Sequence, residues 1–172
     1  TGKTTVIKHL AYSLSRGAGP VPLRGCLPVM VLLKDLWPIY KNALRDGAEN
    51  ITFEALLPGY LKKVQCPLSM ETIEAYLAQD RAFFLLDGLD EGPEENRDHL
   101  VDLLHQFQHA NRANRFLITG RPHGLEGQAG YWFGKFLRDI EPLSEKKAED
   151  FITRWFRAVS GQAKGMADMT AA

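Results

Sequence analysis

The strongest constraint on the fold is a short apolar run that ends abruptly in acidic residues. The run Phe83–Leu86 is followed directly by Asp87 and then by Gly-Leu-Asp-Glu. An unbroken apolar run of this length is typical of a β-strand that is buried on both faces, as in a parallel sheet covered by helices. In such folds ligands bind beyond the carboxyl ends of the strands. The acids after the run are therefore candidates for a binding site.

The rest of the sequence alternates between strand-like and helix-like patterns. The expected strands are Leu27–Leu33, Arg81–Glu91, Arg115–Gly120 and a fourth within Phe133–Leu143. The expected helices are Thr4–Leu14, Thr52–Val64, Ser69–Gln79, Glu94–Ala110 and one with Ser144 as its N-cap. A loop is expected at Lys34–Asn50. Strands that alternate with helices indicate an α/β layered fold with a mostly parallel sheet.

The composition is typical of a soluble globular domain, with 45% hydrophobic and 24% charged residues among 172. Basic and acidic residues both number 21, so no basic field favours nucleic acid or an anionic membrane as a partner. Apolar runs fall short of the roughly 20 residues of a membrane span. Cys26 and Cys66 are far apart and lack CxxC spacing. Reduced thiols and a cytoplasmic location are favoured.

The sequence begins TGKTT, and its Gly2, Lys3 and Thr4 match the last three positions of the phosphate-loop pattern G-x-x-x-x-G-K-[ST]. Glycine lets a phosphate approach the backbone, lysine places a cation on the phosphates, and a threonine hydroxyl can ligate Mg2+. Thr1 and Thr5 flank these residues and complete the expected nucleotide-binding set. The match alone is weak, because an ordinary helix start also explains it.

The acids after the second strand strengthen the nucleotide hypothesis. Asp87 is expected to hold the hydration shell of Mg2+ opposite Thr4, so these two residues are the candidate metal site. Glu91 or Asp90 is expected to orient and polarise an attacking water. The alternative is that one acid caps the next helix. That alternative explains one acid but not three at this spacing.

The third strand also ends in polar residues, within the sequence RFLITGRP. Thr119 is a candidate to touch the attacking water or the γ-phosphate. Arg121 is a candidate to read the charge of the γ-phosphate. The alternative for Arg121 is a surface ion pair.

Taken together, these motifs resemble a NACHT domain. FFLLDGLDE is similar to the extended second acidic motif of that family, in which a small residue follows the first Asp and two acids come after it. The order GKT, LPVMVLLKDL, LLDGLDE, FLITGRP and IEPLSEKKAEDFITRWF is the NACHT order over almost the whole chain. One departure is Gly120, where the family more often has Ser. That departure weakens a role for a hydroxyl there and leaves Arg121 intact.

NACHT domains belong to the STAND class of P-loop NTPases, so the resemblance implies a three-layer α/β/α P-loop sandwich with a mostly parallel sheet. Residues 1–160 would be the nucleotide-binding domain, and residues 161–172 a linker or the start of a further helical segment. The chain begins inside the phosphate loop, which indicates N-terminal truncation with the first strand missing. That strand would lie beside Arg115–Gly120, so we expect this 172-residue chain to fold poorly and to bind ATP weakly.

The resemblance also assigns roles to single residues. The nucleotide-binding residues would be Thr1, Gly2, Lys3, Thr4 and Thr5, the metal residues Thr4 and Asp87, and the catalytic residues Asp90, Glu91 and Arg121. Lys34 resembles the Arg or Lys of the family's L-R/K-D-L stretch.

The implied function is a signalling switch that binds ATP or ADP with Mg2+ and hydrolyses ATP slowly in the intact protein. Its nucleotide state would control self-association, and effector and sensor domains would lie outside this chain. The alternative is an oligomerisation scaffold that binds nucleotide without significant hydrolysis. Adenine is favoured because the guanine-reading motif NKxD is absent from the sequence. Neither nucleic acid nor a membrane is an expected partner.

Two aromatic or histidine-rich stretches invite other interpretations. His105 and His109 have a metal-compatible spacing, but no third ligand is placed, so a solvent-facing helix is favoured. Tyr131–Phe136 contains several aromatic residues, and a packed strand is favoured over stacking on nucleic acid.

Overall fold

The computed structural model describes residues 2–93, 97–141, 144–154 and 156. It divides into two compact units, Thr1–Leu137 and Arg138–Ala172. Thr1 and the expected domain boundary at residue 160, together with the segment after it, lie outside the described residues.

The first unit is built on a parallel sheet of three strands in the order β1-β2-β3. The strands are β1 (Leu27–Leu32), β2 (Ala82–Asp87) and β3 (Arg115–Ile118). The register places Leu32 of β1 opposite Asp87, and Leu86 opposite Ile118 of β3. All three strands therefore end at one edge of the sheet, which we call the carboxyl edge.

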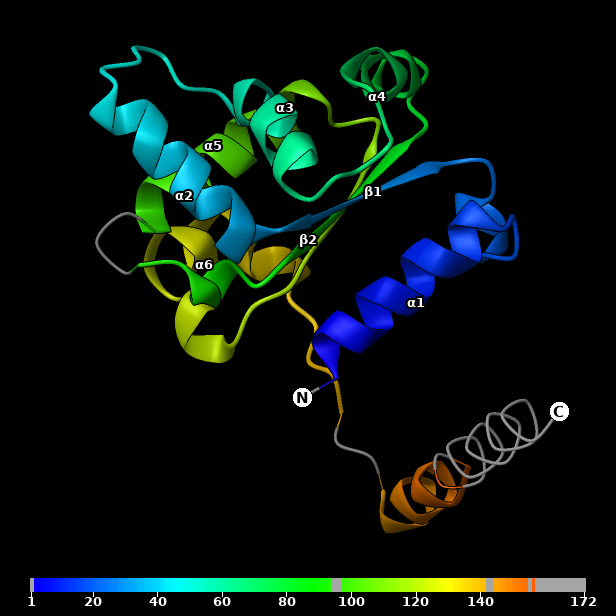
Figure 1. Ribbon diagram of the computed structural model, residues 1–172. Helices are drawn as coiled ribbons and strands as arrows, with labels where there is room; N and C mark the ends of the chain where they lie inside the picture. The colour runs from blue at the N-terminus through cyan, green and yellow to red at the C-terminus, as the bar shows by residue number, and fades with distance from the viewer. Residues whose placement is uncertain (1, 94–96, 142–143, 155, 157–172) are drawn as a thin grey trace, which may run out of the picture. The chain divides into compact units, whose positions relative to one another are not determined.

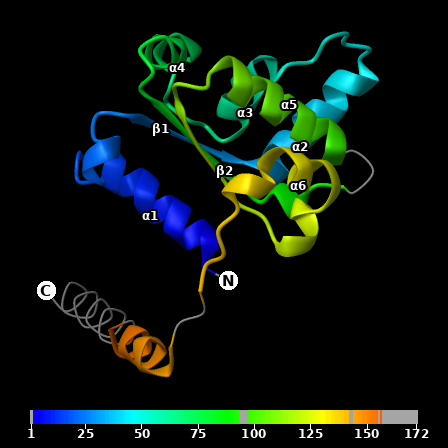
Figure 2. The same cartoon turned by 180° about the vertical axis from the view of Figure 1, so that it is seen from behind.

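Helices cover both faces of this sheet, as Figures 1 and 2 show from opposite sides. One face is covered by α1 (Lys3–Ser15). The other face is covered by α2 (Leu33–Arg45), α3 (Phe53–Lys63), α4 (Met70–Leu77) and α5 (Arg97–Ala110). A further short helix, α6 (Gly127–Phe133), packs against α5. This arrangement confirms the expected three-layer α/β/α fold with a parallel sheet.

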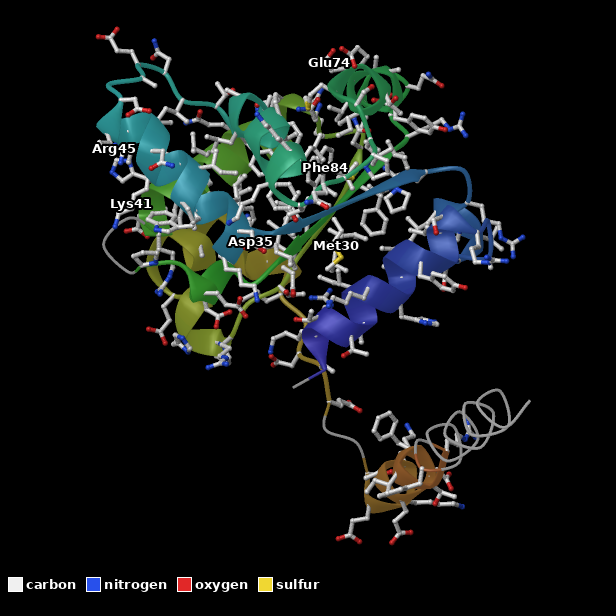
Figure 3. The ribbon with its side chains drawn as sticks, viewed as in Figure 1. Met30, Asp35, Lys41, Arg45, Glu74 and Phe84 are labelled. Atoms are coloured by element: carbon white, nitrogen blue, oxygen red, sulfur yellow. The ribbon has the colours of Figure 1, made fainter. Side chains whose placement is uncertain are left out.

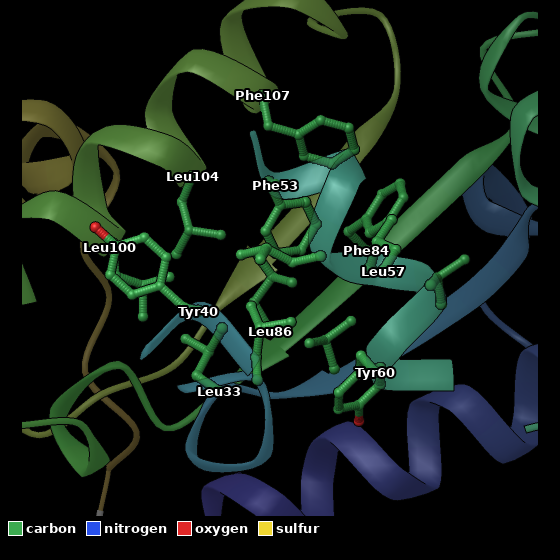
Figure 4. Close-up of a cluster of buried hydrophobic side chains, with 14 of the residues drawn as sticks. Leu33, Tyr40, Phe53, Leu57, Tyr60, Phe84, Leu86, Leu100, Leu104 and Phe107 are labelled. Carbon is green, nitrogen blue, oxygen red and sulfur yellow. The ribbon is translucent and has the colours of Figure 1, made fainter. Parts of the chain in front are cut away.

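The continuous apolar run of β2 serves two separate cores, because successive side chains of a strand point to opposite faces. Phe84 and Leu86 enter a cluster with α2, α3 and α5, which we call the large core (Figure 4). Phe83 and Leu85 join Ile7 of α1 in a smaller cluster, which we call the α1 core. Every residue of β2 is buried, which explains why the run does not alternate.

Aromatic rings fill the centre of the large core. The Phe84 ring meets the Phe107 ring edge-on with a centroid separation of 4.9 Å. Phe53 lies 4.8 Å from Phe107, also between centroids. Figure 3 shows Phe84 on this side of the sheet and Met30 on the side of α1. Aromatic pairs in this distance range add to the gain from burial itself.

Side-chain caps stabilise the starts of two predicted helices. The Thr52 hydroxyl accepts the Ala55 N–H at the start of α3, and the Ser69 hydroxyl accepts the Thr72 N–H at the start of α4. Each bond satisfies one of the backbone donors that a helix start leaves without an intrahelical partner. The predicted helices at Thr52 and Ser69 are confirmed on this basis.

The loop expected at Lys34–Asn50 is wrong for residues 34–45, because α2 begins at Leu33 and runs to Arg45, and only residues 46–50 form a loop. Pro38 lies inside this helix and is exposed. The buried residues of α2 are Leu33, Leu36, Trp37 and Tyr40. Their spacing is that of one helix face. A proline inside a helix costs stability, and the packing of this face outweighs that cost.

The fourth strand expected within Phe133–Leu143 is also wrong for the residues described there. The aromatic stretch instead ends α6 and continues as a 3-10 turn at Gly134–Phe136. Residues 137–141 follow without regular structure. Ala129, Trp132 and Phe133 are buried or half-buried, with helical spacing, so this is the face that packs.

In the second unit, the predicted helix after Ser144 is confirmed for residues 145–154. The Ala148 N–H donates to the Ser144 carbonyl at 2.9 Å, as in a first helical turn. Within the described part of the chain, every helix is too short or too polar to cross a bilayer.

Candidate functional site

The carboxyl edge of the sheet gathers residues from distant parts of the sequence. Beyond β2 lies the acidic turn, which we define as Asp87–Glu91, and beyond β3 lies the β3 loop, defined as Thr119–Pro122. The start of α1 reaches the same edge, because the Thr4 hydroxyl donates to Asp87 Oδ2 at 2.7 Å across 83 residues of sequence. The two residues predicted to serve a metal are therefore in direct contact.

The start of α1 presents open backbone donors. Gly2 is the N-cap residue with φ of 70°, and it makes no side-chain cap among the described residues. The first turn of α1 contains no acid. Lys3 and Thr4 are half-buried, and Thr5 is exposed. A helix start with free N–H groups and a lysine beside it favours an anion.

A Cβ on Gly2 would find no atom within 4 Å, so the space in front of this residue is open. The positive φ of Gly2 is a conformation that glycine adopts without strain. Glycine thus meets the backbone requirement here and leaves room for a phosphate.

Asp87 is buried, with 5% of its surface exposed, and two hydroxyl groups satisfy its carboxylate. Thr4 donates to Oδ2, and Thr119 donates to Oδ1. The Thr119 oxygen also accepts the Gly88 N–H at 3.3 Å. Thr119 was expected to touch the attacking water or the γ-phosphate. Its single proton is instead committed to Asp87, so this threonine orients the carboxylate.

Glu91 folds back over the acidic turn. A Cβ built on Gly88 would lie only 2.9 Å from the Glu91 Cδ atom, and Gly88 has φ of 83°. The Glu91 N–H donates to the Gly88 carbonyl at 3.0 Å. The Glu91 carboxylate therefore lies beside Gly88 and remains exposed to solvent.

Asp90 and Arg121 pair with each other. Asp90 Oδ1 accepts the backbone N–H of Arg121 at 2.9 Å, and Asp90 Oδ2 lies 3.4 Å from the Arg121 Nε atom. The Asp90 side chain is 7% exposed, whereas that of Arg121 is 64% exposed. The two residues were predicted to act separately, and the sequence gives no signal that joins them. An ion pair was the alternative for Arg121, and Asp90 is its partner.

Backbone hydrogen bonds fasten the acidic turn to the β3 loop. The Thr119 N–H donates to the Leu86 carbonyl at 2.9 Å, and the Leu89 N–H donates to the Thr119 carbonyl at 2.8 Å. Together with the side-chain bonds of Asp87 and Asp90, these contacts make the two segments one hydrogen-bonded unit.

Trp37 is a neighbour of the site that was not predicted from the sequence. Trp37 is buried in α2, and a Cβ on Gly92 would lie 3.8 Å from its Cε3 atom. The indole thus packs behind the end of the acidic turn. The helical spacing of Leu33, Leu36, Trp37 and Tyr40 was the available signal. Lys34 lies in the first turn of the same helix, exposed and just beyond β1.

The donor set at Thr4 and Asp87 fits Mg2+, which prefers a few oxygen ligands and keeps several waters or phosphate oxygens. No group of three or more His, Cys, Asp or Glu side chains in the described ranges converges as a metal site. His105 and His109 are among the residues searched. His105 is half-buried and stacks on Trp132 at 3.7 Å between ring centroids. The prediction that this side of α5 faces solvent is therefore wrong at His105.

Comparison with known proteins agrees with this geometry. The model of the NACHT domain family matches residues 1–159. A search of curated proteins and a search of solved structures each found no match. The family match spans the phosphate-loop residues, the acidic turn and the β3 loop. The chain therefore belongs to the NACHT domain family and is a nucleotide-binding NTPase module of the STAND type.

Proposed function

We propose that this domain binds ATP with Mg2+, hydrolyses it slowly and acts as a signalling switch. The observation that carries the proposal is the hydrogen bond from Thr4 to Asp87, because it joins the phosphate-loop residues to the acidic strand. An ordinary helix start would have no reason to place its second residue on a buried carboxylate. The contact is that expected for two residues that share one metal–phosphate site.

In this proposal Thr1, Gly2, Lys3, Thr4 and Thr5 hold the phosphates. The open space before Gly2 and the uncapped start of α1 support it. The Lys3 ammonium would neutralise phosphate charge as a point cation. It makes no ion pair with any described residue, so it is available for that role.

Thr4 and Asp87 would hold Mg2+, which when bound neutralises charge on the phosphate oxygens. The hydrogen bonds of Asp87 would orient its carboxylate for this role. Thr119 fixes one of its oxygens, so the other keeps a defined direction toward Thr4. The carboxylate is thereby preorganised, and binding would cost little rearrangement.

For hydrolysis, the exposed carboxylate of Glu91 would polarise a water, and its position against Gly88, the residue after Asp87, supports this role. Arg121 would read the charge of the γ-phosphate, and Asp90 would support it. Glu91 and Arg121 would be the catalytic groups, with Asp90 supporting Arg121. Slow turnover suits a switch, which needs a lifetime in each nucleotide state.

A second candidate function is a nucleotide-binding oligomerisation scaffold without significant hydrolysis. The pairing of Arg121 with Asp90 favours this candidate, because two groups proposed for catalysis occupy each other. Under either function, nucleotide state would control self-association, effector and sensor domains would supply signal and output, and the location would be cytoplasmic.

The first test compares Lys3→Ala with Lys8→Ala in the intact protein. Lys8 is exposed on the same helix and serves as a matched control. ATP titration by calorimetry should show binding lost in Lys3→Ala and kept in Lys8→Ala. Equal affinity in both variants would contradict the proposed phosphate site.

The second test separates the switch from the scaffold. Glu91→Gln should keep ATP binding and slow phosphate release in a single-turnover assay by about a hundredfold or more. Glu74→Gln, on the exposed surface of α4, is the control. Absence of phosphate release in the wild type would leave the scaffold as the function. Hydrolysis by Glu91→Gln at the wild-type rate would show that Glu91 has no catalytic role.

A further inference from the structure

Asp90 differs from the other acids of the turn in how its carboxylate is used. Both of its oxygens face Arg121, one toward the backbone N–H and one toward the guanidinium Nε. Only 7% of the side chain is exposed. Glu91, by contrast, is exposed and lies over Gly88. A carboxylate that is buried and already paired is poorly placed to polarise a water.

We propose that Asp90 is a positioning residue that fixes the main chain of Arg121 and aims its side chain, and that it touches neither the water nor the nucleotide. The proposal rests on the proposed nucleotide function and assigns a more specific role within it. In this role Asp90 determines where the charge of Arg121 is presented.

The need for such a residue follows from the β3 loop itself. Thr119 is fixed by its hydrogen bonds to the acidic turn, but Gly120 follows it. Glycine gives the backbone more freedom than any other residue. Without a further contact, the flexibility of Gly120 would leave the position of the Arg121 main chain undefined. The hydrogen bond from the Arg121 N–H to Asp90 Oδ1, at 2.9 Å, supplies that contact.

Pro122 limits the backbone from the other side. A residue that precedes proline is held in extended conformations, and Arg121 has φ of −82° and ψ of 158°. The Arg121 main chain is thus fixed from both sides, by Asp90 and by Pro122. Its side chain leaves the backbone in a defined direction.

The two contacts of Asp90 differ in strength. The backbone bond is short and has a charged acceptor, which makes it one of the stronger kinds. The guanidinium contact is longer, at 3.4 Å, and the Arg121 side chain is 64% exposed, so solvent weakens the pair. The guanidinium can therefore leave Asp90 for a phosphate, which offers bidentate geometry, while the main chain stays in place.

A double-mutant cycle tests this proposal in the intact protein. Single-turnover ATP hydrolysis is measured for the wild type, Asp90→Ala, Arg121→Ala and the double variant. If Asp90 acts through Arg121, each single change slows hydrolysis by at least about tenfold, and the double variant is no slower than Arg121→Ala. If the two effects multiply, Asp90 acts independently of Arg121 and the proposal is overturned.

A conservative variant separates positioning from charge. Asp90→Asn keeps an oxygen that can accept the Arg121 N–H, whereas Asp90→Ala does not. We expect Asp90→Asn to hydrolyse ATP within about threefold of the wild type. A loss in Asp90→Asn as large as in Asp90→Ala would overturn the proposal, because a backbone bracket does not need the charge. A general loss of folding would not distinguish the two variants in this way.

The outcomes also separate this proposal from the function on which it rests. If the wild type binds ATP but does not hydrolyse it, the same cycle is read on ATP affinity, where coupled effects support the proposal and independent effects overturn it. If the wild type binds no ATP under conditions where it is folded, the proposed function fails, and this proposal fails with it.

Discussion

The two faces of the sheet are packed very differently. On one side, several helices and the rings of Phe53, Phe84 and Phe107 make the large core. On the other side, α1 covers β2 through the small cluster around Ile7 and Phe83. Yet α1 carries the residues proposed to hold the phosphates.

This difference separates stability from the placement of the site. The large core buries most of the apolar surface and is expected to provide most of the free energy of unfolding. The start of α1 is held by the α1 core and by the hydrogen bond from Thr4 to Asp87. A change in the large core should therefore alter only stability. A change in the α1 core should alter both stability and nucleotide affinity.

The largest expected effect comes from Phe84→Ala. Phe84 is fully buried and its ring contacts those of Phe53, Phe107 and Phe116. Its removal should lower the free energy of unfolding by about 3 to 5 kcal/mol, measured by denaturant titration. Phe136→Ala is the control, because Phe136 is 78% exposed and should change stability by less than about 0.5 kcal/mol.

Ile7→Ala tests the other face and should cost about 2 to 3 kcal/mol. Ile7 is fully buried between α1 and the sheet, with half-buried neighbours that can move toward the space left behind. ATP affinity of the folded protein should fall as well, because Lys3 and Thr4 lie on the same helix. If Phe84→Ala weakens ATP binding by the folded protein as much as Ile7→Ala does, the two faces are not separable in this way.

Gly88→Ala changes the site without touching either core. The positive φ should cost about 1 to 2 kcal/mol, and the new Cβ should push the Glu91 carboxylate away and slow ATP hydrolysis. Gly47→Ala is a matched control, since Gly47 also has a positive φ, of 74°, but its Cβ would meet no atom within 4 Å. The two variants should lose similar stability, and only Gly88→Ala should lose hydrolysis. An equal loss of hydrolysis would show that backbone strain is the cause.

Tyr60→Phe should have the smallest effect, a loss of about 1 kcal/mol at neutral pH. The Tyr60 hydroxyl accepts the Leu32 N–H at 2.9 Å and donates to the Met30 carbonyl at 3.3 Å, which ties α3 to the end of β1. This bond belongs to the side of the large core. ATP affinity should therefore stay unchanged, as the comparison of the two faces requires.

The same variant has a pH signature. Burial raises the pKa of Tyr60 above its ordinary value of about 10. The folded protein therefore holds the phenol proton more tightly than the unfolded chain. The stability linked to Tyr60 is complete below pH of about 10 and is lost as the pH rises through the folded pKa. Unfolding curves at neutral and high pH should show a smaller loss for Tyr60→Phe than for the wild type.

Local patterns were enough to predict the parts of the fold that local physics determines. The apolar run of β2 and its acidic end were read correctly, because burial on both faces leaves no room for polar residues. The helices that begin after Thr52 and Ser69 were also predicted from local patterns. The helix α2 was expected to be a loop, although the buried Leu33, Leu36, Trp37 and Tyr40 have the spacing of one helix face.

The candidate site was predictable in its members but not in its connections. Asp87, Asp90, Glu91 and Arg121 were singled out because polar residues follow apolar, strand-like runs in the sequence. The pairing of Asp90 with Arg121 spans 31 residues of sequence and depends on how β2 and β3 are aligned. No pattern in one sequence encodes that alignment.

The length of β2 determines the position of the site relative to the two cores. Its residues alternate between two cores, and its last residue, Asp87, must reach Thr4. One residue inserted in β2 would have two effects. It would exchange the side chains facing α1 and α5, and it would move Asp87 by about 3.3 Å along the strand. We therefore expect β2 to tolerate substitutions better than insertions or deletions, because a change in length alters the distance between its core residues and Asp87.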